Sequence, residues 1–234
     1  MANSDVIIEL SNVTKTYQQG KVSVHALRGL DLQVRPGEFL ALTGPSGSGK
    51  TTALNIIGAL DTPTSGVAKI DGTDLATLSR ANKSKLRRDR IGFVFQAYNL
   101  IPVLSAYENA ELVLRLQGVA ATERKQRVMK PLEDVGLKGM EHRRPNEMSG
   151  GQQQRVAIAR AIASNPVVTL ADEPTANVDS ATAELLLSLM VKLNRERGIT
   201  FVFSTHDPRV TAKARRIVHM VDGKVDSDTV KEST

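Results

Sequence analysis

The sequence contains no cysteine and no tryptophan, and aromatic residues make up only 3% of it. Without cysteine the chain has neither a disulfide framework nor a thiolate zinc site, which excludes most small secreted scaffolds and zinc fingers. So few aromatics argue against a platform on which single-stranded bases stack. No apolar run approaches the roughly 18 residues that span a membrane, and residues 1–9 do not have the layout of a signal peptide. We therefore expect a soluble chain that stays where it is made.

The size and the charge of the chain narrow the remaining classes of protein. Its 234 residues suffice for one good core with a sizeable insertion, but not for two domains of ordinary size. The formal net charge of +6 is compatible with nucleic acid, an anionic membrane face or a nucleotide as the partner. The motifs have to decide among these.

The strongest motif is the segment 44–51, G-P-S-G-S-G-K-T, which matches the phosphate-binding pattern G-x-x-x-x-G-K-[ST] at every fixed position. A short apolar run at 38–43 precedes it and a helical pattern follows it, which is the context that the motif requires. Its glycines let backbone N–H groups surround a triphosphate, Lys50 adds a mobile positive charge, and the Thr51 hydroxyl is placed to bind Mg²⁺. The alternative is a Gly/Ser turn that happens to end in Lys-Thr, which the flanking strand and helix disfavour.

Two further apolar runs of strand length end in polar side chains that suit nucleotide chemistry. Gln96 follows residues 91–95, and its amide can reach a metal ion or a water molecule there. Asp172 and Glu173 follow residues 167–171, where an aspartate would hold Mg²⁺ through water and the next acid is free for chemistry. The competing explanation for these two acids is a capping pair before a proline turn.

Three other polar segments are ambiguous by themselves. A lone histidine such as His206 is more often structural, but this one follows the strand-like run 200–204, and ligands of open α/β sheets bind at that end of the strands. Residues 149–152, S-G-G-Q, open a helical pattern, so they suit either a second anion site or a serine N-cap with a loose glycine pair. We expect the basic run at 83–90 to be a solvated face.

The remaining patterns predict an α/β chain. Its first two strands would form a small antiparallel sheet ahead of the phosphate loop, with Tyr17 in the loop between them. Pro131 removes a backbone donor, so a kink or a break is expected there. Residues 227–234 are expected to be a frayed tail. Strands are expected at 5–13, 30–34, 67–70, 217–221 and 224–226, and helices at 105–116, at 122–135 and from Asp179 or Ser180 to Gly198.

The phosphate loop, Gln96, S-G-G-Q, L-A-D-E-P-T at 170–175 and His206 occur in the order and at the approximate spacing of an ABC-transporter ATP-binding subunit. The chain resembles this family over nearly its whole length. The resemblance implies a P-loop NTPase core of the RecA-like type with a mainly parallel sheet, a small antiparallel β-subdomain and an α-helical insertion. It places the catalytic core in residues 1–96 and 160–234, and the helical subdomain with the signature motif in residues 97–159.

The resemblance also implies which residues bind ATP. Tyr17 would stack on adenine, and Asp179 would end the loop that links the two sites of a dimer. The residues implied to hold the phosphates are Gly44, Pro45, Ser46, Gly47, Ser48, Gly49, Lys50, Thr51 and Thr52. The signature motif, implied to close on the ATP of a partner subunit, is Ser149, Gly150, Gly151 and Gln152.

The same resemblance implies how ATP would be hydrolysed. Glu173 would polarise the attacking water and His206 would contact the γ-phosphate, with Lys50 and Gln96 completing the catalytic set. The residues implied to bind Mg²⁺ are Thr51, Gln96 and Asp172, the last of them through water. The chain departs from the usual pattern at Met148, where leucine is common, and at residues 176–179, which read A-N-V-D. Both changes conserve bulk and polarity, so we expect an active site.

Within the family, F-Q-A-Y-N-L-I-P-V-L-S-A-Y-E-N, R-V-A-I-A-R-A and R-I-V-H-M-V-D-G are similar to the group that serves lipoprotein-releasing, macrolide-efflux and FtsX-like permeases. This implies an integral-membrane partner of the FtsX-like type, a homodimer formed on ATP binding, and a place on the cytoplasmic face of the membrane. The permease would dock on Tyr98, Leu100, Ile101 and Val103, unless that apolar segment packs inward as core.

A rival reading of the same motifs is a nucleic-acid-handling ABC-type ATPase, which the basic charge permits. The sequence has no coiled-coil arms, no zinc cysteines and no second cassette, so we expect no nucleic acid as a partner. A P-loop kinase or GTPase is a weaker option, because S-G-G-Q and His206 have no role in it.

Overall fold

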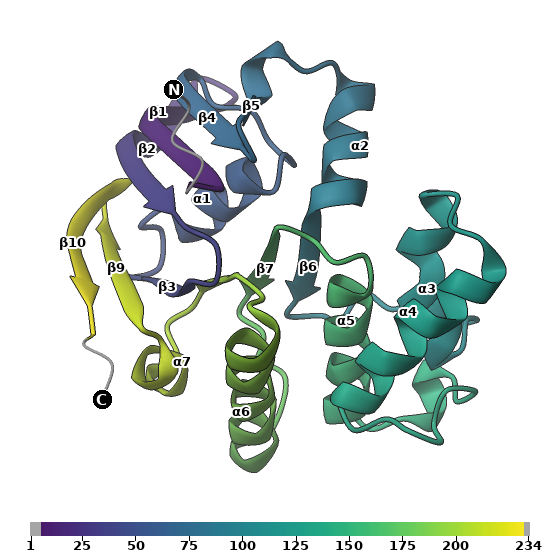
Figure 1. Cartoon of the computed structure of the whole chain (residues 1–234). Coiled ribbons are helices and arrows are strands. Elements are labelled where there is room, and N and C mark those ends of the chain that lie inside the picture. The colour runs from purple at the N-terminus through teal and green to yellow at the C-terminus, as the bar shows by residue number, and fades with distance from the viewer. Residues whose placement is uncertain (1–5, 232–234) are drawn as a thin grey trace.

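The computed structural model describes residues 6–231, which form two β-sheets and the helices around them (Figure 1). The strands are β1 (Ile8–Gln19), β2 (Val22–Val34), β3 (Phe39–Thr43), β4 (Ser65–Ile70), β5 (Thr73–Asp74), β6 (Ile91–Phe95), β7 (Val168–Asp172), β8 (Phe201–Ser204), β9 (Arg216–Val221) and β10 (Lys224–Val230). The helices are α1 (Lys50–Ile57), α2 (Arg80–Arg90), α3 (Ala106–Leu116), α4 (Ala121–Asp134), α5 (Gly150–Ala163), α6 (Ser180–Arg197) and α7 (Pro208–Lys213), with 3₁₀ turns η1 (Leu75–Thr77) and η2 (Pro145–Glu147). The predicted α/β class is confirmed.

The larger sheet has the strand order β10-β9-β3-β8-β7-β6, and every neighbouring pair is parallel except β10 with β9. Strand β3 lies inside this sheet and is buried along its whole length. Its side chains alternate: Phe39 and Ala41 join the core formed with α3 to α6, whereas Leu40 and Leu42 join the core formed with α1 and the second sheet. The predicted mainly parallel sheet is therefore confirmed, and its interior strand carries the phosphate loop at its carboxyl end.

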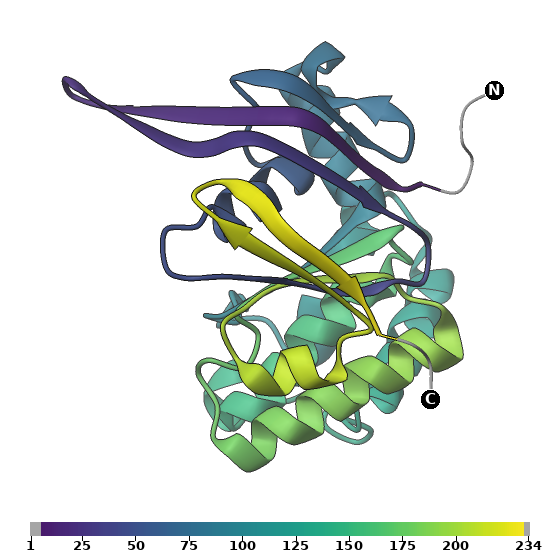
Figure 2. The same cartoon turned by 90° about the vertical axis from the view of Figure 1, so that its left-hand side faces the viewer.

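The second sheet is antiparallel, as predicted, and its strand order is β2-β1-β4-β5. It therefore also contains two strands that follow the phosphate loop, which the prediction did not include. Its first two strands are longer than the sequence patterns indicated, and their hairpin projects beyond the rest of the molecule (Figure 2). Tyr17 lies on β1 opposite Val24, so its expected position in a loop is wrong. The projecting residues 22–25 are exposed to solvent. A strand that is exposed on both faces does not alternate apolar and polar residues, so its sequence does not indicate a strand.

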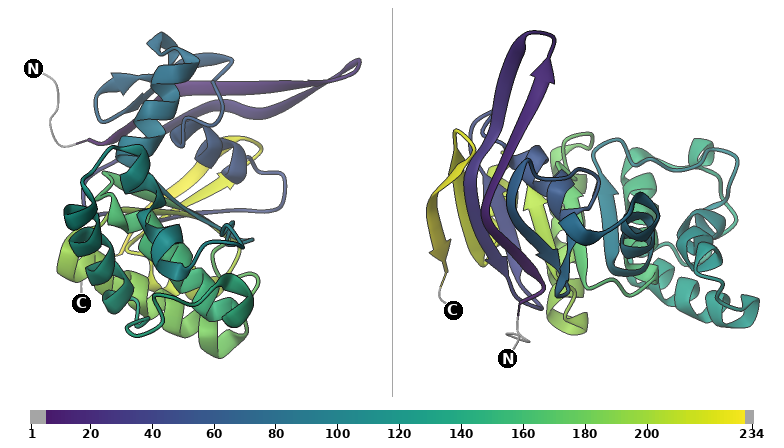
Figure 3. Two further views of the ribbon diagram at one scale, coloured as in Figure 1. Left: turned by 90° about the vertical axis from the view of Figure 1, so that its right-hand side faces the viewer. Right: turned by 90° about the horizontal axis from the view of Figure 1, so that it is seen from above.

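Helices α3, α4 and α5 form a group beside β6, on the side of the molecule away from β9 and β10 (Figure 3). Helix α5 is the innermost of them, because residues 156–159 are fully buried and the helix contacts β6, α3, α4 and α6. It runs without interruption through residue 159, where the predicted helical subdomain ends. The division into 1–96, 97–159 and 160–234 stays a prediction.

A kink or a break is expected at Pro131; helix α4 continues through this residue, so the break does not occur. A proline inside a helix costs about 3 kcal/mol. The ring is buried together with Val128 and Leu132, on the face that joins the core. Burying Val128 and Leu132 contributes about 1.5–3 kcal/mol each, so the packed face of α4 together offsets the cost of the proline.

The basic run becomes helix α2, in which no residue is buried, and the predicted solvated face is confirmed. Its arginines are largely engaged within the chain: Arg87 donates to the Ala59 carbonyl and Arg88 to the Leu116 carbonyl. Within residues 6–231 no helix is both long enough and apolar enough to cross a bilayer.

Strand β10 continues to Val230, so the frayed tail expected from residue 227 is wrong as far as the strand extends. The last part of that expectation, residues 232–234, lies outside the described residues. The long strand arises from its antiparallel pairing with β9, in which Val230 lies opposite Arg216. That pairing joins residues from two separate patterns, so neither pattern alone indicates it.

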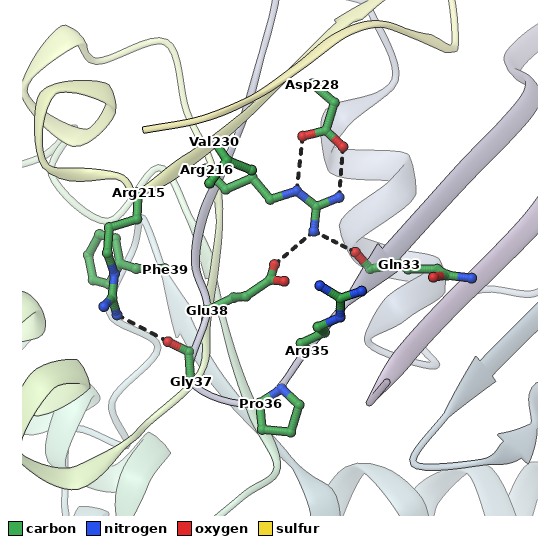
Figure 4. A pocket seen from close by; sticks show the side chains of 10 residues that line it. All are labelled: Gln33, Arg35, Pro36, Gly37, Glu38, Phe39, Arg215, Arg216, Asp228 and Val230. Carbon is green, nitrogen blue, oxygen red and sulfur yellow. Dashed lines mark hydrogen bonds and ion pairs between the residues drawn. The ribbon is translucent and has the colours of Figure 1, made fainter. Parts of the chain in front are cut away.

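Arg216 fastens β10 to the amino-terminal end of β3 (Figure 4). Its guanidinium pairs with Asp228 at 2.7 Å and Glu38 at 2.8 Å, and donates to the Gln33 carbonyl at 2.7 Å. The hydrogen bonds to Asp228 and the charge of Glu38 raise the pKa of Arg216. All four residues line a cavity of about 560 Å³, and both of its carboxylates are paired with Arg216.

We predict that Arg216→Ala lowers the free energy of unfolding by about 1.5–3 kcal/mol, because it leaves Glu38 and Asp228 without their cation. Urea denaturation followed by circular dichroism measures the change. Lys192→Ala is the matched control, since its 4.0 Å pair with Glu196 is exposed, and it should stay within about 0.5 kcal/mol of wild type. Equal effects of the two substitutions would contradict the prediction.

Candidate functional site

A cavity of about 790 Å³ opens at the carboxyl ends of β3, β7 and β8, where ligands of parallel sheets bind. The phosphate loop follows β3, Glu173 follows β7 and His206 follows β8, so one edge of the sheet gathers three segments that are distant in sequence. The residues that line the cavity are Tyr17, Val24, His25, Ala26, Gly44, Pro45, Ser46, Gly47, Gly49, Lys50, Thr51, Thr52, Glu173, Ser204 and His206.

The phosphate loop is wedged between the backbones of other strands. Gly44 has φ of 137°, and a Cβ added to it would lie 2.1 Å from the carbonyl oxygen of Met220 on β9. Gly49 has φ of 99°, and a Cβ there would lie 2.6 Å from the carbonyl oxygen of Ala26 on β2. Both positions therefore require glycine for backbone conformation and for space. The shape of the loop is set by these close approaches.

Lys50 is the first residue of α1, and its side chain is almost completely buried. Its ammonium donates to the carbonyl oxygens of Gly44 at 2.8 Å and Pro45 at 2.9 Å. The expected mobile charge is thus held by its own loop, with two of its three donors used and one left for a ligand. An ammonium held over a loop of backbone N–H groups gives the cavity the positive field that a phosphate chain needs.

Glu173 and His206 form a hydrogen-bonded pair beside this loop. The Glu173 Oε1 lies 2.7 Å from the His206 Nδ1, and Thr205 donates to the Glu173 Oε2 at 3.2 Å. The backbone of Glu173 has φ of 45°, an uncommon conformation for a residue with a side chain. This backbone conformation places the Glu173 side chain at the end of β7, where Thr205 and His206 orient its two carboxylate oxygens.

Asp172 ends β7 and carries a buried oxygen atom that has no protein partner. Its Oδ1, the Ser204 Oγ and the Ser48 Oγ are all buried without a hydrogen-bond partner among the described residues. Burial raises the pKa of Asp172, and the neighbouring charge of Glu173 adds to the effect. Orphaned oxygen atoms of this kind suit a hydrated cation, which would supply the missing partners.

Tyr17 also lines the cavity and is held there by its neighbours. Its hydroxyl donates to Asp61 Oδ2 at 2.7 Å, and Lys15 pairs with the other oxygen of Asp61 while its ammonium lies 4.8 Å from the centre of the Tyr17 ring. Burial, followed by the bond to Asp61, raises the pKa of Tyr17. The ring is therefore held in one orientation by a carboxylate that the sequence analysis had not singled out.

The signature residues lie away from the cavity. Ser149 caps α5: its Oγ accepts from the Gln152 N–H at 3.3 Å, and the Gln152 Oε1 accepts from the Ser149 N–H at 2.9 Å. The N-cap alternative is thus correct for Ser149. A Cβ added to Gly151 would lie 2.4 Å from the Thr182 side chain of α6, so the glycine pair is packed and not loose. Asp179 caps α6 through Thr182, as expected.

Gln96 does not line the cavity either. Its side-chain Nε2 donates to the Asn177 Oδ1, and its backbone carbonyl accepts from the Asn177 Nδ2. Asn177 lies in the loop between Glu173 and Asp179. Asn177 stands out in the sequence only as part of that loop, and no motif includes Gln154. Gln154 is fully buried on α5 and donates to the Phe95 carbonyl at 3.4 Å and the Pro174 carbonyl at 2.7 Å. A polar residue on the apolar face of a helix was the only signal for it.

Comparison with known proteins identifies a family model, ABC transporter, that matches residues 27–176. An ABC transporter ATP-binding protein of Methanocaldococcus jannaschii, MJ0796, is 48% identical over 95% of this chain and 96% of its own length. The lipoprotein-releasing system ATP-binding protein LolD of Anaeromyxobacter dehalogenans is 47% identical over 94% of this chain and 93% of its own. The macrolide export ATP-binding/permease protein MacB of Syntrophobacter fumaroxidans is 47% identical, and the match covers 95% of this chain but 32% of that longer protein.

Among solved structures, a dimeric post-hydrolysis state of the MJ0796 cassette bound to ADP and Pi superimposes with a TM-score of 0.87 at 45% identity. The match covers 97% of this chain and all of that one. The phosphate loop and Glu173 described above lie within the residues that the family model matches.

We predict that Gly44→Ala lowers the free energy of unfolding by about 2–4 kcal/mol, because its methyl group would collide with the Met220 carbonyl. Gly47→Ala is the control: φ is 82° there but no atom lies within 4 Å, so only the conformational cost of about 1–2 kcal/mol remains. Urea denaturation of both variants measures the difference. Losses of equal size would show that the close approach to β9 does not shape the loop.

Proposed function

The chain belongs to the ABC transporter family as an ATP-binding subunit and ATPase, and we propose that two copies of it close around two Mg²⁺-ATP to drive a separate membrane permease. The observation that carries the proposal is the cavity that unites the phosphate loop, Lys50 and the Glu173–His206 pair. A phosphate chain, a positive field and an oriented carboxylate are the parts that phosphoryl transfer to water requires.

The geometry supports one role for each side of the cavity. The N–H groups of the phosphate loop and the remaining donor of Lys50 bind the β- and γ-phosphates. Glu173 accepts a hydrogen bond from the water that attacks the γ-phosphate, and His206 keeps the carboxylate in place while its exposed edge reaches the phosphate. Tyr17 offers adenine one face of its ring, because the Lys15 ammonium lies over the other.

Mg²⁺ fits the polar groups between the loop and β7. Residues 6–231 contain no cluster of three His, Cys, Asp or Glu side chains that could hold a metal by themselves. The ion would instead be shared by the phosphates, the Thr51 hydroxyl, the Gln96 amide and, through water, the orphaned Asp172 Oδ1. When bound, it neutralises charge that develops on the phosphates.

A second copy of the chain would supply the signature segment, which does not line the chain's own cavity. Ser149 to Gln152 do not line the chain's own cavity, yet they present a helix N-terminus with small residues, which favours an anion. The proposed dimer brings this segment of each copy to the ATP of the other, with Asp179 in the loop that joins the two sites. The subunit would then sit on the cytoplasmic face of the membrane through its permease.

The nucleic-acid alternative has less support. In the basic helix α2, Arg87 and Arg88 donate to carbonyl oxygens of the same chain, and Arg90 pairs with Asp71. These three side chains already have partners within the chain, which disfavours a role in binding phosphates of nucleic acid. By their names, MacB is a macrolide export protein and LolD belongs to a lipoprotein-releasing system.

The proposal predicts that Glu173→Gln binds ATP, dimerises only when ATP is present and hydrolyses it at least about 100-fold more slowly, because an amide does not accept the proton of the attacking water. Lys50→Ala should lose ATP binding itself. Adding Ser149→Arg to Glu173→Gln should abolish the dimer. Single-turnover assays and light scattering measure these effects.

Ser79→Arg in the same Glu173→Gln background is the matched control, since Ser79 also caps an exposed helix N-terminus, that of α2. It should leave the ATP-dependent dimer intact. Turnover of Glu173→Gln at the wild-type rate would remove the role of Glu173. A monomer at high protein concentration with ATP would refute the sandwich.

The permease would dock on the segment after Gln96. Ile101 is 37% and Val103 72% exposed, whereas Leu100 packs against the core and Tyr98 is half-buried. The two exposed side chains thus form an apolar surface next to a residue proposed to sense Mg²⁺-ATP, and such surfaces commonly bind partners. Tyr98 and Leu100 would support this surface from below.

We predict that Ile101→Glu and Val103→Glu weaken capture of the permease and uncouple transport, while ATP binding to the isolated subunit stays within about twofold of wild type, as expected for exposed positions. Affinity capture from detergent-solubilised membranes, with wild type in parallel, measures the first effect. Val22→Glu, a valine 63% exposed on the hairpin, is the control. Unfolding, or a parallel loss of ATP affinity, would show that the segment is core.

A further inference from the structure

Asn177 joins the loop after β7 to the segment after β6. Its side-chain Nδ2 donates to the Gln96 carbonyl oxygen at 2.9 Å, and its Oδ1 accepts from the Gln96 Nε2 at 3.4 Å. Its own backbone carbonyl accepts from the Tyr98 hydroxyl at 3.0 Å. One residue thus makes three hydrogen bonds to a segment 79 to 81 positions earlier in the chain.

These bonds favour one orientation of the Gln96 side-chain amide. A backbone carbonyl only accepts, so the Asn177 atom that faces the Gln96 carbonyl has to be the NH₂ group. The other end of that amide is then an oxygen, which requires the NH₂ group of Gln96 to face it. No described residue donates to the Gln96 Oε1, and the oxygen is left free to bind a cation.

The backbone of this contact is braced from α5. Tyr98 and Asn99 have φ of 56° and 50°, and Arg160 of α5 donates to both of their carbonyl oxygens. A Cβ added to Gly150, at the start of α5, would lie 2.8 Å from the Tyr98 hydroxyl. The Tyr98 hydroxyl therefore lies between the signature segment and Asn177, and its hydrogen bond ties the Asn177 backbone to the segment after Gln96.

We propose that Asn177 is a positioning residue for Mg²⁺ binding: it orients the Gln96 amide so that its oxygen faces the ion on the nucleotide. This inference rests on the proposed function, because it takes Gln96 as a metal ligand. A glutamine amide without a fixed partner adopts both orientations before the ion binds, and only the orientation that presents its oxygen can ligate a cation. Asn177 favours that orientation.

The test uses the Glu173→Gln subunit, which keeps the nucleotide intact, and titrates Mg²⁺ while binding of a fluorescent ATP analogue is followed. Adding Asn177→Ala should raise the half-saturating Mg²⁺ concentration on the order of three- to tenfold, as expected for one or two lost hydrogen bonds. Binding of the analogue in EDTA should not change. Asn82→Ala, on helix α2 away from the cavity, is the matched control and should not shift either value.

A double-mutant cycle separates positioning from a general structural role. If Asn177 acts through Gln96, Gln96→Ala and Gln96→Ala/Asn177→Ala should have the same Mg²⁺ requirement. Additive shifts, or an unchanged requirement in Asn177→Ala, would overturn the inference. Where Asn177→Ala lowers the melting temperature, Tyr98→Phe replaces it; this variant keeps the Asn177 side chain and should give a smaller shift in the same direction. No shift in Tyr98→Phe would also overturn the inference.

The same titration distinguishes failure of this inference from failure of the proposed function. A wild-type chain that binds no ATP analogue at any Mg²⁺ concentration would refute the function itself. Normal binding of the analogue, with no effect of Gln96→Ala on the Mg²⁺ requirement, would refute only the place of Gln96 and Asn177 at the metal.

Discussion

The phosphate loop depends on close backbone packing more than on any side chain. Gly44 lies against a carbonyl of β9 and Gly49 against a carbonyl of β2, while the Gly223 N–H after β9 donates to the Ser48 carbonyl at 3.0 Å. The loop takes its shape only when the parallel sheet and the long hairpin are both in place. The loop that would surround a phosphate is also the place where the two sheets meet. Its binding conformation therefore depends on the folding of both sheets.

Helix α5 has a similar place on the other side of the site. Gln154 bonds to the ends of both β6 and β7, and Arg160 holds the carbonyls that follow Gln96. The proposed metal, water and permease contacts thus share one buried helix whose first turn is the signature segment. A shift of that helix would be transmitted through these hydrogen bonds to the backbone segments that neighbour Gln96 and Glu173.

Much of the site could be predicted because each apolar strand ends in a polar residue, and parallel strands place those ends on one edge. Glu173 and His206 were expected together for that reason, and they share a hydrogen bond. The bonds of Tyr17 to Asp61 and of Asn177 to Gln96 join residues 44 and 81 positions apart, which no local pattern records. The errors have the same origin: Pro131 stays helical and β10 stays ordered through packing against distant elements.

The fixing of Tyr17 by Asp61 has a mechanical consequence. Asp61 comes shortly after helix α1 and its N–H donates to the Asn55 carbonyl of that helix at 3.1 Å, and the same helix begins with Lys50. The ring that would face the base and the loop that would hold the phosphates are therefore attached to one short helix. The two ends of a bound nucleotide would then travel as a single body with α1. In the proposed dimer, the two subunits would then separate as two such bodies, each with its nucleotide still held at both ends.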